Sequence, residues 1–352
     1  MAKVDLDVLL EELVLREGSD LHLRYGEPPT IRVAGKLQKL EQPPLDDNDL
    51  KEIIFGLMSP LQQKQFLKAL EFDMAYEISG VARFRVNIFK QMGHIGAVMR
   101  IIPLKIKTID EWGFPAVFKK IASLPRGLVL VTGPTGSGKS TTLAAIIEYI
   151  NQNMKKHIIT VEDPIEFLHR DKKSIIEQRE IGIDTHSYAE ALRRIIRQNP
   201  DIILVGEMRD LETIAQTITA AETGHLVFST LHTIDAVQTV DRIIDVFPPT
   251  QQQQIRLQLS TTLQAVITET LVRKKDGAGR VAAFEIMVCT PAIRSAIREA
   301  KTPQIYTSIQ TGSKLGMIQM DQYLKNLFHQ GVVEYEEALA HCNNPDEFER
   351  RA

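Results

Sequence analysis

The spacing of apolar residues divides the chain into two parts with different patterns. In the first part, apolar residues recur at helical spacing over residues 5–16 and again over 46–70. Each of these segments is followed by short runs that alternate between apolar and polar residues, over 21–23 and 30–33 and then over 72–78 and 82–102. Alternation of this kind is typical of strands that bury one face. The order of elements predicts an α+β domain that ends near residue 102.

After this domain the pattern changes. Residues 103–115 carry a proline at each end and are interpreted as the linker between two domains. From residue 116, continuous apolar runs alternate with helical segments, which indicates a mostly parallel sheet with helices on both faces. The predicted strands lie at residues 127–132, 157–161, 202–205 and 226–229. The part after about residue 250 is expected to be mostly helical, and the whole second domain, 116–352, is predicted to be α/β.

A glycine-rich loop follows the first of these strands. It reads Gly-Pro-Thr-Gly-Ser-Gly-Lys-Ser, and a helix is predicted to begin at its lysine. In a phosphate-binding loop, glycines let backbone N–H groups face phosphate oxygens, the lysine contacts the β- and γ-phosphates, and the last hydroxyl binds Mg²⁺. The helix adds the positive end of its dipole. The predicted ATP-binding residues are Gly133, Pro134, Thr135, Gly136, Ser137, Gly138, Lys139, Ser140 and Thr141, with Ser140 also a magnesium ligand.

Acidic residues follow two other predicted strands of the second domain. Glu162 and Asp163 begin the sequence Glu-Asp-Pro-Ile-Glu, which ends at Glu166, and Glu207 follows the strand at 202–205. Ligands of parallel sheets bind at the carboxyl ends of strands, where a carboxylate can orient the water that attacks a phosphate. We predict Glu162 and Asp163 as ATP-binding residues and Glu166 and Glu207 as catalytic residues. The alternative role for such acids is to cap helices.

Histidines and arginines complete the candidate site. His225 and His232 lie on either side of the strand at 226–229, and a histidine there could sense a γ-phosphate. Arg83 and Arg85 lie two apart on a predicted strand, so both side chains project from one face and could stabilise charge on the γ-phosphate. Arg126, before the loop strand, is a further ATP-binding candidate. A structural histidine and a solvated strand face are the alternative interpretations.

Charge and cysteine content narrow the class of partner. The formal net charge is −3, so the chain has no global basic field that would draw it to nucleic acid, and no nucleic-acid partner is expected. Its two cysteines, Cys289 and Cys342, form no Cys-x-x-Cys pair, which favours a reducing cytoplasm. Apolar stretches fall short of the roughly 18 residues of a membrane-spanning helix, so none is predicted.

Four motifs in order resemble the secretion and pilus ATPase superfamily. They are the glycine-rich loop, Val-Glu-Asp-Pro-Ile-Glu, Leu-Val-Gly-Glu-Met-Arg-Asp, and Thr-Gly-His followed by Thr-Leu-His-Thr. The resemblance implies a RecA-like ATPase domain after a PAS-like domain, assembled as a ring of six. It also implies that Glu166 activates water, that Glu207 acts on Mg²⁺ through water, and that Arg83 and Arg85 reach a nucleotide. The roles of the two glutamates could be exchanged.

A segment near the C-terminus is similar to the Ala-Ile-Arg-Asn-Leu-Ile-Arg-Glu motif of pilus retraction ATPases. Here it reads Ala-Ile-Arg-Ser-Ala-Ile-Arg-Glu, with departures at Ser295 and Ala296, and Gly-Met-Ile-Gln-Met-Asp follows at 316–321. Its spacing predicts an amphipathic helix with residues 292, 293, 296 and 297 on the apolar side; a packed surface helix is the simpler alternative. The motif residues carried over are Ala292, Ile293, Arg294, Ile297, Arg298 and Glu299.

This resemblance implies a function and a place in the cell. The chain is expected to be a hexameric cytoplasmic motor that couples ATP hydrolysis to the retraction of type IV pili, with Mg²⁺ as cofactor. Its expected partner is a platform protein of the inner membrane, at whose cytoplasmic face the motor would act. The four-cysteine zinc element of pilus-extension and type II secretion relatives is missing from the sequence. An accessory retraction ATPase, or a motor of a related type II secretion system, is the alternative.

Overall fold

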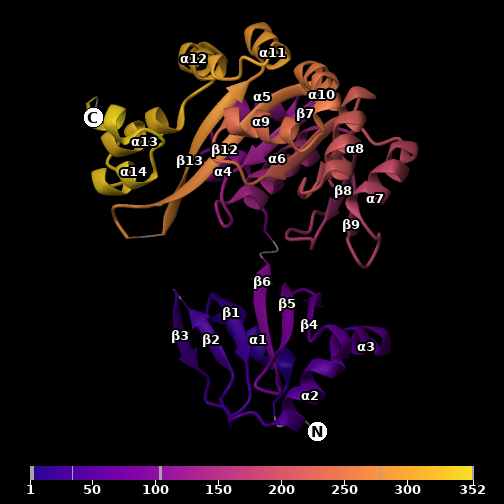
Figure 1. Ribbon diagram of the computed structural model, residues 1–352. Helices are drawn as coiled ribbons and strands as arrows, with labels where there is room; N and C mark the ends of the chain where they lie inside the picture. Colours follow the sequence, from indigo (N-terminus) through magenta and orange to yellow (C-terminus); the bar gives the residue numbers. More distant parts are fainter. Residues whose placement is uncertain (1–3, 34, 103–104, 278, 351–352) are drawn as a thin grey trace. The chain divides into compact units, whose positions relative to one another are not determined.

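A computed structural model describes residues 4–33, 35–102, 105–277 and 279–350 of the chain (Figure 1). Contacts divide the chain into two units. The first unit holds residues 1–105 and Glu166–Leu168, and the second holds 106–165 and 169–352. Of the predicted linker, Pro103 and Leu104 lie outside the described residues, and helix α4 (Ile109–Trp112) forms within the remainder. The domain limits drawn from the sequence stay a prediction.

The first unit is built on one antiparallel sheet, which confirms the α+β class. Its strands are ordered β3-β2-β1-β6-β5-β4, and each neighbouring pair is antiparallel. The strands are β1 (Gly18–Leu23), β2 (Thr30–Val33), β3 (Lys36–Lys39), β4 (Glu71–Ile78), β5 (Ala82–Gln91) and β6 (His94–Ile102). The helices are α1 (Leu6–Leu15), α2 (Asp47–Gly56) and α3 (Pro60–Ala69). Strand β3 lies outside the runs in which alternation predicted strands.

The single helix expected over residues 46–70 is wrong in one respect, because the structure forms two helices there. The second helix, α3, begins at Pro60. The side chain of Ser59 accepts a hydrogen bond from the backbone N–H of Gln62, and the Gln62 side chain accepts the N–H of Ser59 in return. Such a capping box with proline at the first helical position starts a new helix.

The second unit is α/β, as predicted, with a seven-stranded sheet ordered β13-β12-β7-β11-β10-β8-β9. All neighbouring strands are parallel except β12 and β13. The strands are β7 (Gly127–Thr132), β8 (His157–Glu162), β9 (Ile175–Glu180), β10 (Ile202–Val205), β11 (Leu226–Leu231), β12 (Leu263–Arg273) and β13 (Arg280–Val288). The four strands predicted for the parallel sheet are therefore all present.

Helices cover both faces of this sheet. Alternate residues of β7 belong to different cores, with Leu128 and Leu130 in one and Val129 and Val131 in the other. The helices are α5 (Val117–Ala122), α6 (Lys139–Asn153), α7 (Tyr188–Ile195), α8 (Leu211–Glu222), α9 (Ala236–Asp245), α10 (Pro249–Thr262), α11 (Pro291–Arg298), α12 (Gln304–Thr311), α13 (Met320–His329), α14 (Tyr335–His341) and α15 (Pro345–Arg350). In the described part of the chain, no helix is both long and apolar enough to cross a membrane.

Most elements after about residue 250 are helices, as expected, but the expectation missed two strands. The two longest strands of the second sheet, β12 and β13, form a hairpin there, and β12 pairs with β7. The run 263–273 is rich in β-branched residues, which favour strands. Polar residues at 268–270 interrupt its apolar pattern and hid this preference. The strand that carries the glycine-rich loop is therefore flanked on one side by β12.

Candidate functional site

The glycine-rich loop joins β7 directly to α6. Gly133, Gly136 and Gly138 have φ values of 139°, 79° and 106°, a region that L side chains rarely adopt. A Cβ at Gly133 would lie only 2.2 Å from the backbone oxygen of Glu269 in β12. Lys139, the first residue of α6, donates from Nζ to the carbonyls of Gly133 and Pro134, each at 2.9 Å. Glycine backbone, a helix start and an ammonium group together fit a phosphate.

The remaining residues of the loop vary in exposure. Pro134, Thr135 and Gly136 are exposed, whereas Ser137 is buried. Ser140 and Thr141, in the first turn of α6, are half-buried. The hydroxyl of Ser140 follows the lysine, which is the position that binds Mg²⁺ in loops of this kind. The loop thus has the residue types and the backbone that a magnesium–nucleotide complex needs.

The carboxyl ends of three further parallel strands lie at the same edge of the sheet as this loop. Glu162 ends β8, Glu207 follows β10, and His232 follows β11. His232 Nε2 lies 2.9 Å from Glu207 Oε1, so two predicted site residues are in contact. Arg209, which the sequence did not single out, lies 2.8 Å from the other oxygen of Glu207. Parallel strand direction is what brings these side chains together.

The environment of Glu207 keeps it ionised. Its side chain is only 17% exposed. Partial burial by itself would raise the pKa of Glu207, but the hydrogen bond from Arg209 and the field of His232 outweigh it, so the pKa lies below its usual value. A carboxylate held in this state can accept hydrogen bonds from metal-bound water. This arrangement suits a role near Mg²⁺ better than proton abstraction from water.

The acidic sequence after β8 lies near the half-buried Tyr188. Glu162 Oε1 accepts hydrogen bonds from Thr160 Oγ1 at 2.7 Å and from Gln178 Nε2 at 3.3 Å. Burial, and then the charge of Asp163, raise the pKa of the Tyr188 hydroxyl. A Cβ added at Gly206 would lie 2.7 Å from that hydroxyl, so a larger residue there would require the Tyr188 side chain to shift. Sequence reasoning missed Tyr188, which has no motif around it.

Three predicted site residues belong to the first unit. Arg83 and Arg85 lie on β5, where they alternate with buried Phe84 and are themselves half-buried. Glu166, the last residue of the acidic sequence, is grouped by its contacts with the first unit, and its side chain is 44% exposed. Their assignment to catalysis stays a prediction.

His225 and Arg126 precede their strands and lie at the opposite edge of the sheet from the loop, and their assignment to the site stays a prediction. The carbonyl of His225 accepts the N–H of Gly127, the first residue of β7, at 2.9 Å. His225 Nδ1 lies 2.9 Å from the carbonyl oxygen of Ala220, in the last turn of α8. Six residues of β11, about 20 Å of strand, separate His225 from His232. A residue before a parallel strand cannot share an edge with residues after it.

Glu269 is the residue beneath the loop that sequence reasoning missed. It lies on β12, is 1% exposed, and accepts a hydrogen bond of 2.6 Å from Thr142 Oγ1 in α6. Burial raises the pKa of Glu269 to about 8, although Thr142 and Lys139 act in the opposite direction. An acid in the middle of a run rich in β-branched residues was the available signal, and the helical interpretation of this region concealed it.

The retraction-motif helix is α11, and its six motif residues differ in environment. Ile293 and Ile297 are buried, whereas Ala292 is exposed, so its predicted place on the apolar side is wrong. Thr290 caps the helix by accepting the N–H of Ile293, which leaves residue 292 in the outward part of the first turn. Glu299 follows the last turn and receives a hydrogen bond from Ser295 at 2.6 Å.

Arg294 and Arg298 of α11 have different partners. Arg294 donates to the carbonyls of Ser260 and Thr261, at the end of α10, at 2.9 and 3.0 Å, and to Gln264 Oε1 at 3.0 Å. Arg298 is exposed and contacts Ser295 Oγ at 3.3 Å. Arg294 therefore joins two helices, and Arg298 faces outward.

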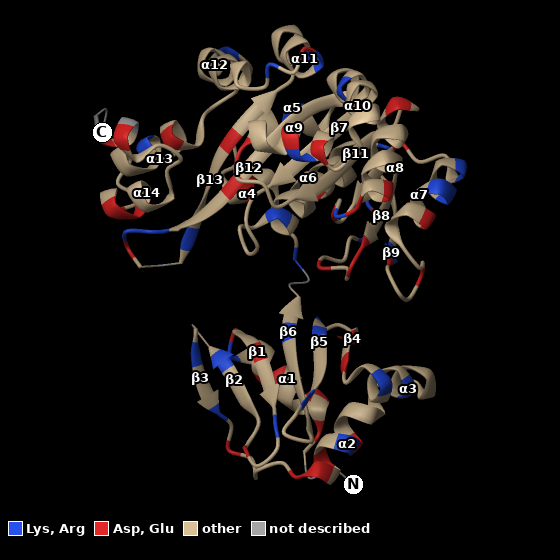
Figure 2. Ribbon diagram, in the orientation of Figure 1, with Lys and Arg blue, Asp and Glu red and all other residues tan. Residues whose placement is uncertain are grey.

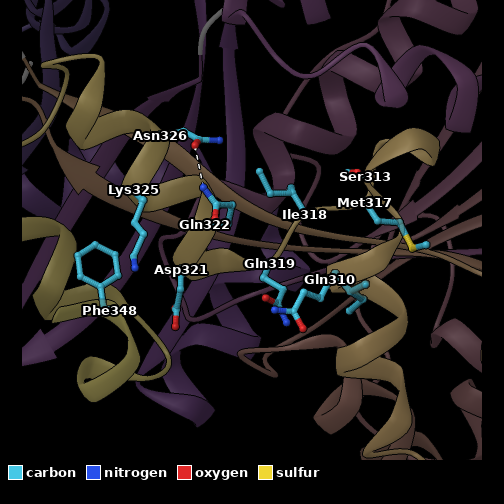
Figure 3. Close-up of a pocket in the computed structure, with 11 residues that line it drawn as sticks. Gln310, Ser313, Met317, Ile318, Gln319, Asp321, Gln322, Lys325, Asn326 and Phe348 are labelled. Atoms are coloured by element: carbon cyan, nitrogen blue, oxygen red, sulfur yellow. Dashed lines mark hydrogen bonds between the residues drawn. The ribbon is translucent and has the colours of Figure 1, made fainter. Parts of the chain in front are cut away.

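A pocket of about 310 Å³ lies among the C-terminal helices α12, α13 and α15 (Figure 3). Its polar side chains contact neighbouring parts of the chain. Asp321 accepts the backbone N–H groups of Asn343 and Asn344, and the ammonium of Lys325 lies 4.9 Å from the centre of the Phe348 ring. These contacts hold α13 to the end of the chain.

Basic and acidic residues are interspersed along the ribbon of each unit (Figure 2). The arginines of α7 illustrate this. Arg193 pairs with Glu212 of α8, and Arg194 pairs with Glu190 one turn earlier at 2.9 Å. The charges of these two arginines are therefore balanced by neighbouring carboxylates.

Comparisons with known proteins agree with the motifs. Residues 2–339 match the family described as Type II/IV secretion system protein. The chain is 52% identical to "Type IV pilus retractation ATPase PilT" of Pseudomonas aeruginosa, over 98% of this chain and 100% of that protein. It is 49% identical to "Twitching motility protein" of Neisseria gonorrhoeae, over 90% of this chain and 85% of that one. A crystal structure of "the Pilus Retraction Motor PilT and Bound ADP" superposes with a TM-score of 0.93 at 43% identity, covering 99% of both chains.

Proposed function

The chain belongs to the type II/IV secretion system protein family, and on this premise we propose that it is a motor ATPase that retracts type IV pili. The observation that carries the proposal is the likeness to a pilus retraction ATPase along nearly the whole chain. That likeness spans both units and includes α11, so it extends beyond the phosphate loop that many unrelated ATPases share.

ATP would bind at the loop between β7 and α6. The backbone of 133–138 and the start of α6 favour phosphate, and Lys139 would exchange its two carbonyl acceptors for phosphate oxygens. Ser140, with Glu207 acting through water, would hold Mg²⁺, which supplies charge neutralisation on the phosphates when bound. Thr135, Ser137, Thr141, Glu162 and Asp163 complete the proposed ATP-binding set.

Hydrolysis would need groups from both units. Glu166 is proposed to orient and deprotonate the attacking water, and Arg83 and Arg85 to stabilise the charge that develops on the γ-phosphate. His232, which contacts Glu207, would sense whether a γ-phosphate is bound and change the position of the loop that follows β11. Coupling between a loop of the second unit and arginines of the first would turn hydrolysis into movement.

The motor is proposed to assemble as a ring of six at the cytoplasmic face of the inner membrane, where it would act on a platform protein of the pilus machine. The support for assembly is the same full-length likeness to a retraction motor. The outward-facing part of α11, with Ala292, Arg298 and Glu299, is the proposed surface for this retraction-specific step.

Replacement of Lys139 in the host tests the function. Lys139→Ala should remove ATP binding, and the cells should keep excess surface pili while they lose twitching motility. Lys155→Ala, an exposed lysine beyond the other end of α6, is the matched control and should leave both unchanged. Bald cells would contradict retraction. Purified chain that releases no phosphate with ATP and Mg²⁺ would instead indicate a nucleotide-gated scaffold.

A further inference from the structure

Glu269 touches the phosphate loop at its start, at its end and in the helix that follows. Its backbone oxygen lies against Gly133, close enough that a Cβ there would be at 2.2 Å. Its Oε1 would lie 3.2 Å from a Cβ at Gly138. Its Oε2 accepts the hydrogen bond from Thr142 in the first turn of α6. One residue of β12 therefore supports the whole loop from beneath.

One oxygen of this carboxyl group is unsatisfied. Among the described residues, Oε1 has no hydrogen-bond partner, although that atom is buried. A buried acceptor without a partner costs about 1–3 kcal/mol, and more if it carries charge. The cost falls when the group is protonated. The site therefore favours a neutral carboxyl group.

The charged groups around Glu269 do little to offset this. Lys139, at the start of α6, is the cation whose field reaches it. Strand β7 has no titratable side chain from 127 to 132. On β13, Phe284 lies directly opposite Glu269, and Glu285 faces the other side of the sheet, where it accepts the N–H of Ala236 at 2.9 Å. An ionised Glu269 would share Lys139 with any phosphate bound above the loop.

We propose that Glu269 is a positioning residue of the phosphate site, which holds the loop for nucleotide when its carboxyl group is protonated and weakens nucleotide binding when it ionises. The inference rests on the proposed function, because it requires that the loop binds nucleotide. Phosphate and an ionised Glu269 on opposite sides of one thin loop repel each other, and the intervening medium screens them weakly. Nucleotide and the proton on Glu269 therefore bind cooperatively.

The sign of the pH effect follows from this linkage. Bound nucleotide raises the proton affinity of Glu269, so the protein takes up a proton on binding wherever free Glu269 is ionised. Since the free group has a pKa of about 8, the dissociation constant for ADP should rise about tenfold between pH 7 and pH 9.

The test is ADP binding to the full chain, with Mg²⁺, at pH 7 and pH 9, measured by calorimetry. Wild type should show the tenfold loss of affinity, and Glu269→Gln, which keeps the acceptor for Thr142 without the charge, should change less than twofold. Glu285→Gln, the equally buried acid on the opposite face, should behave like wild type. Glu269→Ala should bind weakly at both pH values because it removes the support.

Three outcomes would overturn the inference. One is an equal rise of the ADP dissociation constant from pH 7 to pH 9 in Glu269→Gln and wild type. Another is a wild-type dissociation constant that does not change between these pH values. If wild type does not bind ADP at pH 7, the proposed function fails with it, so the two failures are distinguishable. If Glu269→Gln does not fold, the number of protons that wild type takes up on ADP binding tests the inference instead. At pH 8, ADP binding should take up about half a proton in buffers of different ionisation enthalpy, and zero uptake would refute the proposal.

Discussion

The sheets of the two units are covered in different ways. Along β5 of the first unit, buried residues alternate with half-buried ones, so Phe84 and Val86 enter the core while Arg85 and Asn87 lie on the other face. Along β7 of the second unit, every residue is buried, and successive side chains enter two different cores. The first sheet can carry polar chemistry on a strand face.

The second sheet has no face left for such chemistry along β7. Its candidate functional groups lie where strands end, as Glu207 and His232 do, or are buried beneath a loop, as Glu269 is. This difference indicates that polar groups can lie on a strand face in the first unit but only at strand ends or beneath a loop in the second. It also predicts that replacing adjacent residues of a strand will change the unfolding free energy by different amounts in the first unit, and by large amounts at both positions in the second.

The largest effect is expected from the exposed face of β5. Arg83→Ala with Arg85→Ala should lower the ATP turnover number by about a thousandfold or more, the range of arginines that stabilise phosphoryl transfer. Affinity for ADP should change little. Stability should not fall, because Arg85 lies opposite Arg100 on β6 and like charges across a sheet repel. Steady-state phosphate release measures the effect, and Asn87→Ala on the same face is the control. Unchanged turnover would remove these arginines from the site.

A second prediction concerns adjacent residues in the two sheets. On β11, Val227 and Phe228 are both buried but belong to opposite cores. Replacement of Phe228 by Ala should cost about 3–5 kcal/mol of unfolding free energy, and Val227→Ala about 2 kcal/mol. On β5, Val86→Ala should cost a similar amount, whereas Asn87→Ala should stay within about 0.5 kcal/mol.

Hydrogen exchange of the β5 and β11 amides, followed by mass spectrometry, reports both units in one experiment. Protection should fall in β11 for both of its variants, and in β5 for Val86→Ala alone. A small effect of Val227→Ala would mean that one face of the second sheet is less tightly covered than its burial indicates.

Sequence reasoning found those parts of the fold whose patterns are local. Continuous apolar runs predicted four parallel strands, alternation predicted β4 to β6, and the glycine-rich loop was placed at the correct strand end. The hairpin of β12 and β13 was missed because polar residues at 268–270 break its apolar run. Their burial depends on β7 and α6, which are distant in sequence.

The candidate site was predicted as far as strand direction alone allows. Residues after strands, such as Glu207 and His232, were correctly brought to one edge. His225 and Arg126 were grouped with them because they are near in sequence, although they precede their strands. Glu269 could not be linked to the loop without the strand order, since 127 residues separate it from Thr142.

Buried acids in the two units should respond to pH with opposite signs. Burial raises the pKa of Glu285, on β13, to about 7. The unfolded chain then loses this proton at lower pH than the folded chain. The contribution of Glu285 to the unfolding free energy is therefore largest below about pH 4.5 and falls as pH rises towards 7. The loss is on the order of 3 kcal/mol for a shift of this size. Trp112 fluorescence in urea reports it, because this tryptophan lies in the second unit.

The pKa of Asp20 in the first unit is shifted in the opposite direction. Burial by itself would raise the pKa of Asp20, but hydrogen bonds from Arg100 and Ser19 outweigh it and lower the pKa. Its contribution is therefore present above about pH 3.8 and is lost as pH falls through the folded pKa. Glu285→Gln should reduce the response of the second unit between pH 5 and 7, leave the part that Glu269 contributes up to about pH 8, and leave the acid response of the first unit unchanged. A response in the second unit that Glu285→Gln does not alter would assign it to other groups.

The smallest effect is expected in the helices that cover the second sheet. Arg294 and Arg298 lie one turn apart on α11, yet Arg294 donates to two carbonyls at the end of α10, where a cation also favours the helix dipole. Arg294→Ala should cost about 1–2 kcal/mol of unfolding free energy, because it removes the donor to buried Ser260, whereas the carbonyl of exposed Thr261 can bind water instead. Arg298→Ala should cost less than about 0.5 kcal/mol. If α11 has a retraction-specific surface, Arg298→Ala should still reduce twitching motility while the purified chain hydrolyses ATP normally. Loss of stability in Arg298→Ala, or normal motility, would mean that α11 acts only as part of the covering layer.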